Sequence, residues 1–116
     1  MEYAVPELVA PYRVLVLAAS TEGWYASANE ERARVLDALR ALLRGVGEDG
    51  ARLIGSFDDD LFATGQPSSL PYSIYAIYDV DDLGAIVALV HQVRTELGHA
   101  LRLEARVGRR LFLLDN

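Results

Sequence analysis

Residues 12–20 read Tyr-Arg-Val-Leu-Val-Leu-Ala-Ala-Ser, and every position from Val14 to Ala19 is apolar. A strand that is covered on both faces is apolar on both sides, whereas a half-exposed strand alternates apolar and polar residues. The run therefore predicts a central strand over residues 12–20, and the rest of the sheet is built outward from it.

A polar loop containing Gly23 is expected next, followed by a helix for which Ser27 is the N-cap and Glu30 completes a capping box. The predicted apolar stripe of this helix is Val35, Leu36, Leu39, Leu42, Leu43 and Val46. Gly45, Gly47 and Gly50 are expected to end the helix, and Arg32, Asp37, Arg40 and Arg44 to face water.

A second helix is predicted after Asp81 or Asp82, either of which can cap it, and it ends at Gly98. Its expected stripe is Leu83, Ile86, Val87, Val90, Val93 and Leu97. Further strands are predicted over 51–59, 72–80 and 101–107, with a short final strand over 110–114. The range 101–107 alternates as a strand with one wet face does.

The predicted order is β-α-β-β-α-β, the split ferredoxin-like unit, as one α+β domain over 1–116 with 1–11 as an extended lead-in. The usual strand order of this unit is 4-1-3-2, with both helices on one face of an antiparallel sheet. The other face would expose a large apolar patch unless it is covered. Two such sheets packed face to face would form a dimeric α+β barrel, so a homodimer is expected.

Composition limits the classes of protein to consider. The chain has 116 residues, 52% of them apolar, no cysteine and a net charge of −6, which argues against a nucleic-acid partner. The longest apolar run is far shorter than the roughly 20 residues of a membrane helix, so a cytoplasmic protein without membrane contact is expected. No nucleotide-binding, serine-hydrolase or zinc-protease motif is present.

Three adjacent carboxylates, Asp58, Asp59 and Asp60, end the second strand. They could supply a general base or bind a hard cation. They could also be a solvated strand end, or the edge of a dimer lying opposite Arg102 and Arg106 of the mate.

Several segments in the second half of the chain match a known pattern in order and spacing: Gly55–Asp60, Gly65, Pro71–Tyr75, Asp79–Asp82, Val93–Thr95 and Glu104–Arg109. With these motifs the chain resembles the small IacB-like proteins encoded in bacterial indole-3-acetate degradation clusters, beside a flavin-dependent monooxygenase. The resemblance implies a dimeric α+β barrel and a role in aromatic metabolism. The sequence departs from the family pattern at Tyr72, where the family has Trp. It also departs at residues 98–100, where the segment after the second helix is shorter than in the family. A relative that acts in another aromatic or natural-product biosynthesis pathway fits equally well.

The candidate catalytic residues are Asp58, Asp59 and Asp60 as a base, with Arg94 or Arg106 holding a substrate carboxylate. The candidate substrate-binding residues are Trp24, Tyr25, Tyr72, Tyr75 and His91. The arginines could instead form ion pairs within the protein, the strand tyrosines could pack in the core or the dimer interface, and His91 could be a surface residue.

The leading hypothesis is a small enzyme that acts on an aromatic, indole-like metabolite made by a partner monooxygenase. The reaction would be proton transfer, rearrangement or cofactor-independent oxidation. A non-catalytic accessory that binds the metabolite or the monooxygenase is the alternative. No cofactor or metal is expected, and haem at His91 is the less favoured alternative.

Overall fold

The computed structural model of the chain describes residues 10–48, 50–59, 64–65, 72–109 and 113. Along the chain the elements are β1 (Tyr12–Ser20), α1 (Glu22–Tyr25), α2 (Asn29–Glu48), β2 (Ala51–Asp58), β3 (Ile74–Val80), α3 (Gly84–Leu97) and β4 (Leu101–Gly108). The predicted short strand over 110–114, the lead-in before residue 10 and Asp60 lie outside the described residues, apart from Leu113. Apart from the short helix α1, this is the predicted order.

The four strands form one antiparallel sheet in the order β2-β3-β1-β4. The pairing confirms the predicted ferredoxin-like α+β architecture, with β1 and β3 in the centre and β2 and β4 at the edges. The register between β2 and β3 shifts between Leu53 and Gly55, so that Leu53 lies opposite Tyr78 but Gly55 lies opposite Ile77. This irregularity leaves Ile54 as an extra residue, as in a β-bulge.

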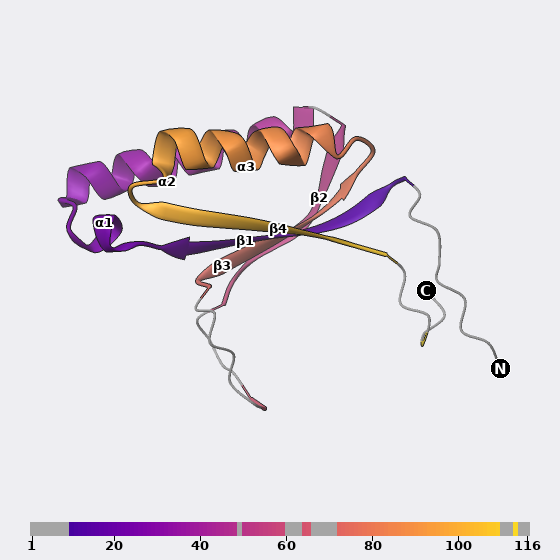
Figure 1. Ribbon diagram of the computed structural model, residues 1–116, viewed down its shortest axis with the longest axis horizontal. Coiled ribbons are helices and arrows are strands. Elements are labelled where there is room, and N and C mark those ends of the chain that lie inside the picture. The colour runs from indigo at the N-terminus through magenta and orange to yellow at the C-terminus, as the bar shows by residue number, and fades with distance from the viewer. Residues whose placement is uncertain (1–9, 49, 60–63, 66–71, 110–112, 114–116) are drawn as a thin grey trace.

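The two long helices form a single layer over one face of the sheet, and no described helix covers the other face (Figure 1). The core lies between the helices and the sheet, where Val14, Val16 and Tyr78 of the central strands are almost inaccessible. The uncovered side of the sheet is called the open face below. Alternation along β1 explains the division, because residues of even number point to the helices and residues of odd number to the open face.

Helix α2 differs from its prediction at both ends. Its first backbone bond is donated by Arg32 to the carbonyl of Ala28, and the hydroxyl of Ser27 donates to the carbonyl of Gly23 at 2.6 Å. The predicted capping box is therefore wrong, because Ser27 belongs to the turn after α1. The helix also continues through Gly45 and Gly47, and the turn comes at Gly50, whose φ of 87° suits glycine.

At the start of helix α3 the N-cap position is Leu83, one residue after the predicted Asp82. The carboxylate of Asp82 nevertheless accepts a hydrogen bond from the backbone N–H of Gly84, the first residue of α3, at 2.8 Å. The predicted stripe was wrong in two respects. Val87 is 68% exposed, whereas Leu89, which the prediction omitted, is 2% exposed. Helix α3 packs on both β4 and α2, so its buried surface is rotated from the stripe that periodicity alone predicted.

Candidate functional site

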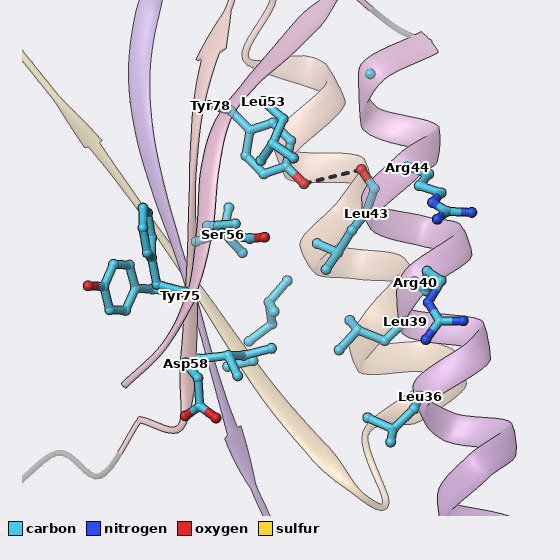
Figure 2. Close-up of a pocket in the computed structure, with 17 residues that line it drawn as sticks. Leu36, Leu39, Arg40, Leu43, Arg44, Leu53, Ser56, Asp58, Tyr75 and Tyr78 are labelled. Atoms are coloured by element: carbon cyan, nitrogen blue, oxygen red, sulfur yellow. Dashed lines mark hydrogen bonds between the residues drawn. The ribbon is translucent and has the colours of Figure 1, made fainter. Parts of the chain in front are cut away.

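The described residues enclose a cleft of about 730 Å³ between α2 and the sheet, on the side of the edge strand β2 (Figure 2). Its size is in the range of small-molecule sites. The walls are mainly apolar: Leu36, Leu39 and Leu43 come from α2, Leu53 from β2, Ile74, Ala76 and Tyr78 from β3, and Leu103 from β4. Such a lining favours an apolar ligand.

The cleft exists because α2 packs mainly against α3 and leaves β2 partly uncovered. Leu53 is 52% exposed and Leu36 is 47% exposed, although both face the space between helix and sheet. A monomer normally hides leucine side chains that face its own interior. The exposure of these two leucines is therefore the clearest indication that a ligand could cover this surface.

Tyr78 forms part of the cleft wall and ties the sheet to α2. Its phenol donates a hydrogen bond to the backbone carbonyl of Leu43 at 3.2 Å (Figure 2). Burial raises the pKa of the Tyr78 phenol. The phenol therefore stays neutral. Its ring forms part of the cleft wall, and its hydroxyl group is held in place by the bond to Leu43.

The polar residues of the cleft lie at separate places along its length (Figure 2). Asp58 and Ser56 come from β2 on the same side of the sheet as Ile74 and Ala76, their partners in the register. Arg40 and Arg44 line the rim from α2, and Arg44 lies near the end marked by Leu53 and Tyr78. From Leu53 to Asp58 the strand spans roughly 16 Å at its usual rise. Arg44 and Asp58 therefore lie toward opposite ends of the cleft, and Arg40 lies between them along its length (Figure 2).

The open face of the sheet has an apolar centre of half-buried side chains. Leu15 and Leu17 of β1 lie opposite Ile77 and Tyr75 of β3, and Phe57 of β2 lies opposite Tyr75. The rings of Phe57 and Tyr75 have centroids 5.2 Å apart. Tyr75 points away from the cleft (Figure 2), so this predicted ligand-binding residue belongs to the open face.

Charged groups border the apolar centre at one end of the open face. Asp79 of β3 pairs with Arg13 of β1 at 2.5 Å and with Arg52 of β2 at 3.0 Å. The hydrogen bond from Arg13, together with that from Arg52, lowers the pKa of the Asp79 carboxyl. Three neighbouring strands are thereby joined across the sheet.

A second polar cluster lies at the other end of the open face. The phenol of Tyr72 donates a hydrogen bond to Glu104 of β4, and Arg106 donates to the same carboxylate oxygen at 3.1 Å. The bond from Tyr72, followed by that from Arg106, lowers the pKa of Glu104, and Glu104 in turn raises the pKa of the Tyr72 phenol. Two predicted site residues therefore meet here, and Arg106 forms the ion pair that was the alternative to substrate binding.

The remaining predicted residues are dispersed. Asp59 is exposed beyond the end of β2, where its N–H donates to the carbonyl of Ser73 at 2.8 Å. His91 and Arg94 are exposed on α3, and neither lines the cleft. Of the predicted catalytic residues that the structure describes, Asp58 alone lines the cleft.

Trp24 and Tyr25 belong to α1, a short helix where a loop was predicted, and neither lines the cleft. Arg32 donates hydrogen bonds to the carbonyls of both residues at 2.9 Å, and its guanidinium lies 5.5 Å from the centre of the Trp24 ring. Trp24 packs on the core, so its surroundings are those of a structural residue.

The cleft residues that the sequence interpretation missed are Arg40 and Arg44, together with the exposed leucines. Arg40 and Arg44 are exposed, as expected, but they also line the cleft, because they flank the apolar stripe at i and i+4 beside Leu36, Leu39 and Leu43. Basic residues at the edge of an unusually wide apolar stripe were the available signal.

No group of three or more metal-binding side chains occurs among the residues that the structure describes. In the same part of the chain, no helix combines the length and apolar character needed to cross a membrane. A scan against protein-family models finds no matching family, and a search of the curated proteins finds no match.

Proposed function

We propose that the protein binds a small aromatic metabolite in the cleft between α2 and β2 and transforms it by proton transfer. The observation that supports this function is an apolar cleft of about 730 Å³ with one carboxylate, Asp58, and one hydroxyl, Ser56, on its wall. Apolar walls with a few polar groups are typical of sites that bind and orient planar organic ligands.

Asp58 is the group proposed to act as the base. A carboxylate can accept a proton from one atom of the bound metabolite and return it to another, which produces an isomer without an oxidant or reductant. The reaction needs no cofactor in this proposal. Ser56, two residues earlier on the same side of β2, is within the same wall and is proposed to orient the ligand by a hydrogen bond.

The class of metabolite rests on the resemblance to the IacB-like proteins. That resemblance suggests an indole-like compound, oxygenated by a flavin-dependent monooxygenase before it reaches this protein. Arg94, Arg106 and His91 do not line the cleft, and the ring of Tyr75 points away from it (Figure 2), so the proposal assigns none of them a contact with the ligand.

Binding is tested by native mass spectrometry with indole-3-acetate and its ring-hydroxylated derivatives. We expect one ligand per chain, and we expect Ser56→Trp to abolish retention because the indole ring fills the cleft. Ile54→Trp is the matched control, since Ile54 is the extra residue of the bulge and does not line the cleft. Equal retention by the two variants would contradict the proposed location.

Turnover is tested by mass-spectrometric analysis of the same compounds after incubation with the protein. Asp58→Asn should abolish product formation and retain the ligand, whereas Asp59→Asn should have little effect because Asp59 lies outside the cleft. If both variants bind the ligand and wild-type protein forms no product, the non-catalytic accessory role replaces the enzymatic one.

The open face is proposed to be covered by a second copy of the chain. Its centre, Leu15, Leu17, Phe57, Tyr75 and Ile77, is a contiguous apolar surface on two central strands and one edge strand. The edges of the sheet differ in charge. Asp58 ends β2 and Asp59 follows it, whereas Arg102 and Arg106 lie on β4 and Arg109 follows β4. A twofold axis parallel to the strands would place the acidic edge of each copy against the basic edge of its mate.

The dimer is tested by analytical ultracentrifugation. Ile77→Asp should convert a dimer to a monomer, because it buries a carboxylate in the centre of the interface. Val87→Asp is the control, since Val87 is equally apolar and 68% exposed, but lies on α3. A monomeric wild-type protein would contradict the dimer without bearing on the cleft.

A further inference from the structure

We infer that the cleft selects an elongated apolar acid, whose anionic group is bound by Arg40 and Arg44 on the α2 rim while its apolar body lies along the leucines. This inference rests on the proposed function of the cleft and adds to it the charge of the ligand and the residues that recognise it.

Arg40 and Arg44 are one turn apart on α2, so their side chains share one face of the helix and are close enough to bind a single anion. Two like charges at this spacing repel each other, which destabilises a helix unless an anion lies between them. Guanidinium groups bind carboxylates through paired hydrogen bonds. Both side chains line the cleft, so an anion held there would belong to a ligand in the cleft.

The existing partners of these arginines leave them available to a ligand. Arg40 pairs with Asp37 at 3.5 Å, but the two side chains are 63% and 75% exposed, and an ion pair of this kind is weak. Among the described residues, none forms an ion pair with Arg44. By contrast, Arg34 on the same helix already pairs with Glu31.

The charges in the cleft also determine the orientation of the ligand. The carboxylate of Asp58 would repel an anion at its own end, and Arg44 lies toward the opposite end, beside Leu53 and Tyr78 (Figure 2). The bound acid is therefore directed with its anionic group toward α2 and with the other end toward Asp58. A hydrogen-bond donor at that far end would be matched by the Asp58 carboxylate.

The test uses two fluorescent probes that differ mainly in one charge, 8-anilinonaphthalene-1-sulfonate and the uncharged N-phenyl-1-naphthylamine. Affinities are measured by titration for wild-type protein, Arg40→Gln, Arg44→Gln and the double variant. The controls are Arg34→Gln, on α2 outside the cleft, and Arg94→Gln, which removes the arginine of α3 predicted to hold a carboxylate.

We expect the double variant to weaken the sulfonate probe by roughly five- to tenfold, a range between an exposed ion pair and a charge-assisted hydrogen bond. The uncharged probe should bind all variants equally. Added salt should weaken the sulfonate probe with wild-type protein and have much less effect with the double variant.

Two contrary results are distinguishable. In the first, Ser56→Trp loses affinity for both probes, but the double arginine variant binds the sulfonate probe as tightly as wild type does. The specificity for an acid is then overturned, and the cleft remains the binding site. In the second, Ser56→Trp binds both probes as tightly as wild type does. The cleft is then not the binding site, and both the inference and the proposed function fail.

Discussion

The phenol of Tyr78 donates to the backbone carbonyl of Leu43, which joins the central strand β3 to the helix α2 across the cleft wall. We predict that Tyr78→Phe lowers the free energy of unfolding by about 1 kcal/mol, the usual net value of a hydrogen bond. Urea denaturation measures this change. Tyr25→Phe should have no effect, because Tyr25 is 70% exposed; equal loss in both variants would show that the Tyr78 bond contributes nothing.

The buried surface of α3 is tested by a pair of alanine substitutions. Leu89→Ala should lower the free energy of unfolding by about 2–5 kcal/mol, since it leaves a cavity in the core. Val87→Ala should change it by less than about 0.5 kcal/mol, because the side chain is largely in water. A larger loss of unfolding free energy for Val87→Ala than for Leu89→Ala would mean that α3 buries a different face from the one described.

Two glycines should respond in opposite directions to alanine. A Cβ atom at Gly23 would lie 1.8 Å from the carbonyl oxygen of His99, so Gly23→Ala must displace α1 from the turn before β4 and destabilise the protein. At Gly45, inside α2, a Cβ meets nothing within 4 Å. Gly45→Ala should stabilise by about 0.5–1 kcal/mol, as expected for an unobstructed helix position. Thermal unfolding of the two variants distinguishes these outcomes.

Asp79 should make stability depend on pH on the acidic side. Its pKa is lowered in the folded state by Arg13 and Arg52, so the unfolded chain binds more protons as the pH falls below its ordinary value of about 4. The stabilisation is therefore present above that pH and is lost as the pH falls through the folded pKa. Wild-type protein and Asp79→Asn should converge in stability at low pH, measured by urea unfolding.

Asp81→Asn is the control for this experiment, since Asp81 is exposed and has no ion pair with the described residues. It should follow the wild-type pH dependence throughout. A constant difference in stability between wild type and Asp79→Asn at all pH values would contradict the electrostatic explanation.

The cluster of Tyr72, Glu104 and Arg106 predicts two effects on one pKa. Tyr72→Phe and Arg106→Gln should each raise the pKa of Glu104, because each removes a hydrogen bond that lowers it. Carbon NMR of the Glu104 carboxyl during a pH titration measures both shifts. If either variant left the pKa of Glu104 unchanged, the hydrogen bond from that residue would not stabilise the carboxylate.

The arrangement of elements followed from local periodicity. The apolar run of residues 12–20 became a central strand with those bounds, and the alternation beginning at Leu101 became an edge strand. Periodicity is a property of neighbouring residues, so it can be read without the fold. The errors came where tertiary contacts decide, as at Val87 and Leu89, whose burial depends on the elements that α3 packs against.

The candidate site was less predictable, because a cleft is a relation between elements distant in the sequence. Asp58 was identified as a candidate from its acidic neighbours. The wide apolar stripe of α2 marked Arg40 and Arg44 as its flanking residues, but it did not show that they would share a cleft with Asp58. Their meeting depends on the lateral position of α2 over the edge of the sheet, which is determined by its packing against α3.

The sequence by itself determined the ferredoxin-like order of helices and strands, since apolar spacing and turn residues specify each element locally. Only the tertiary structure decided which face of β2 carries Asp58. The register shift between Leu53 and Gly55 turns Ser56 and Asp58 toward α2 and Phe57 toward the open face. Because side chains alternate along a strand, one extra residue exchanges the two faces, and the bulge therefore places a carboxylate in the cleft and an aromatic ring outside it.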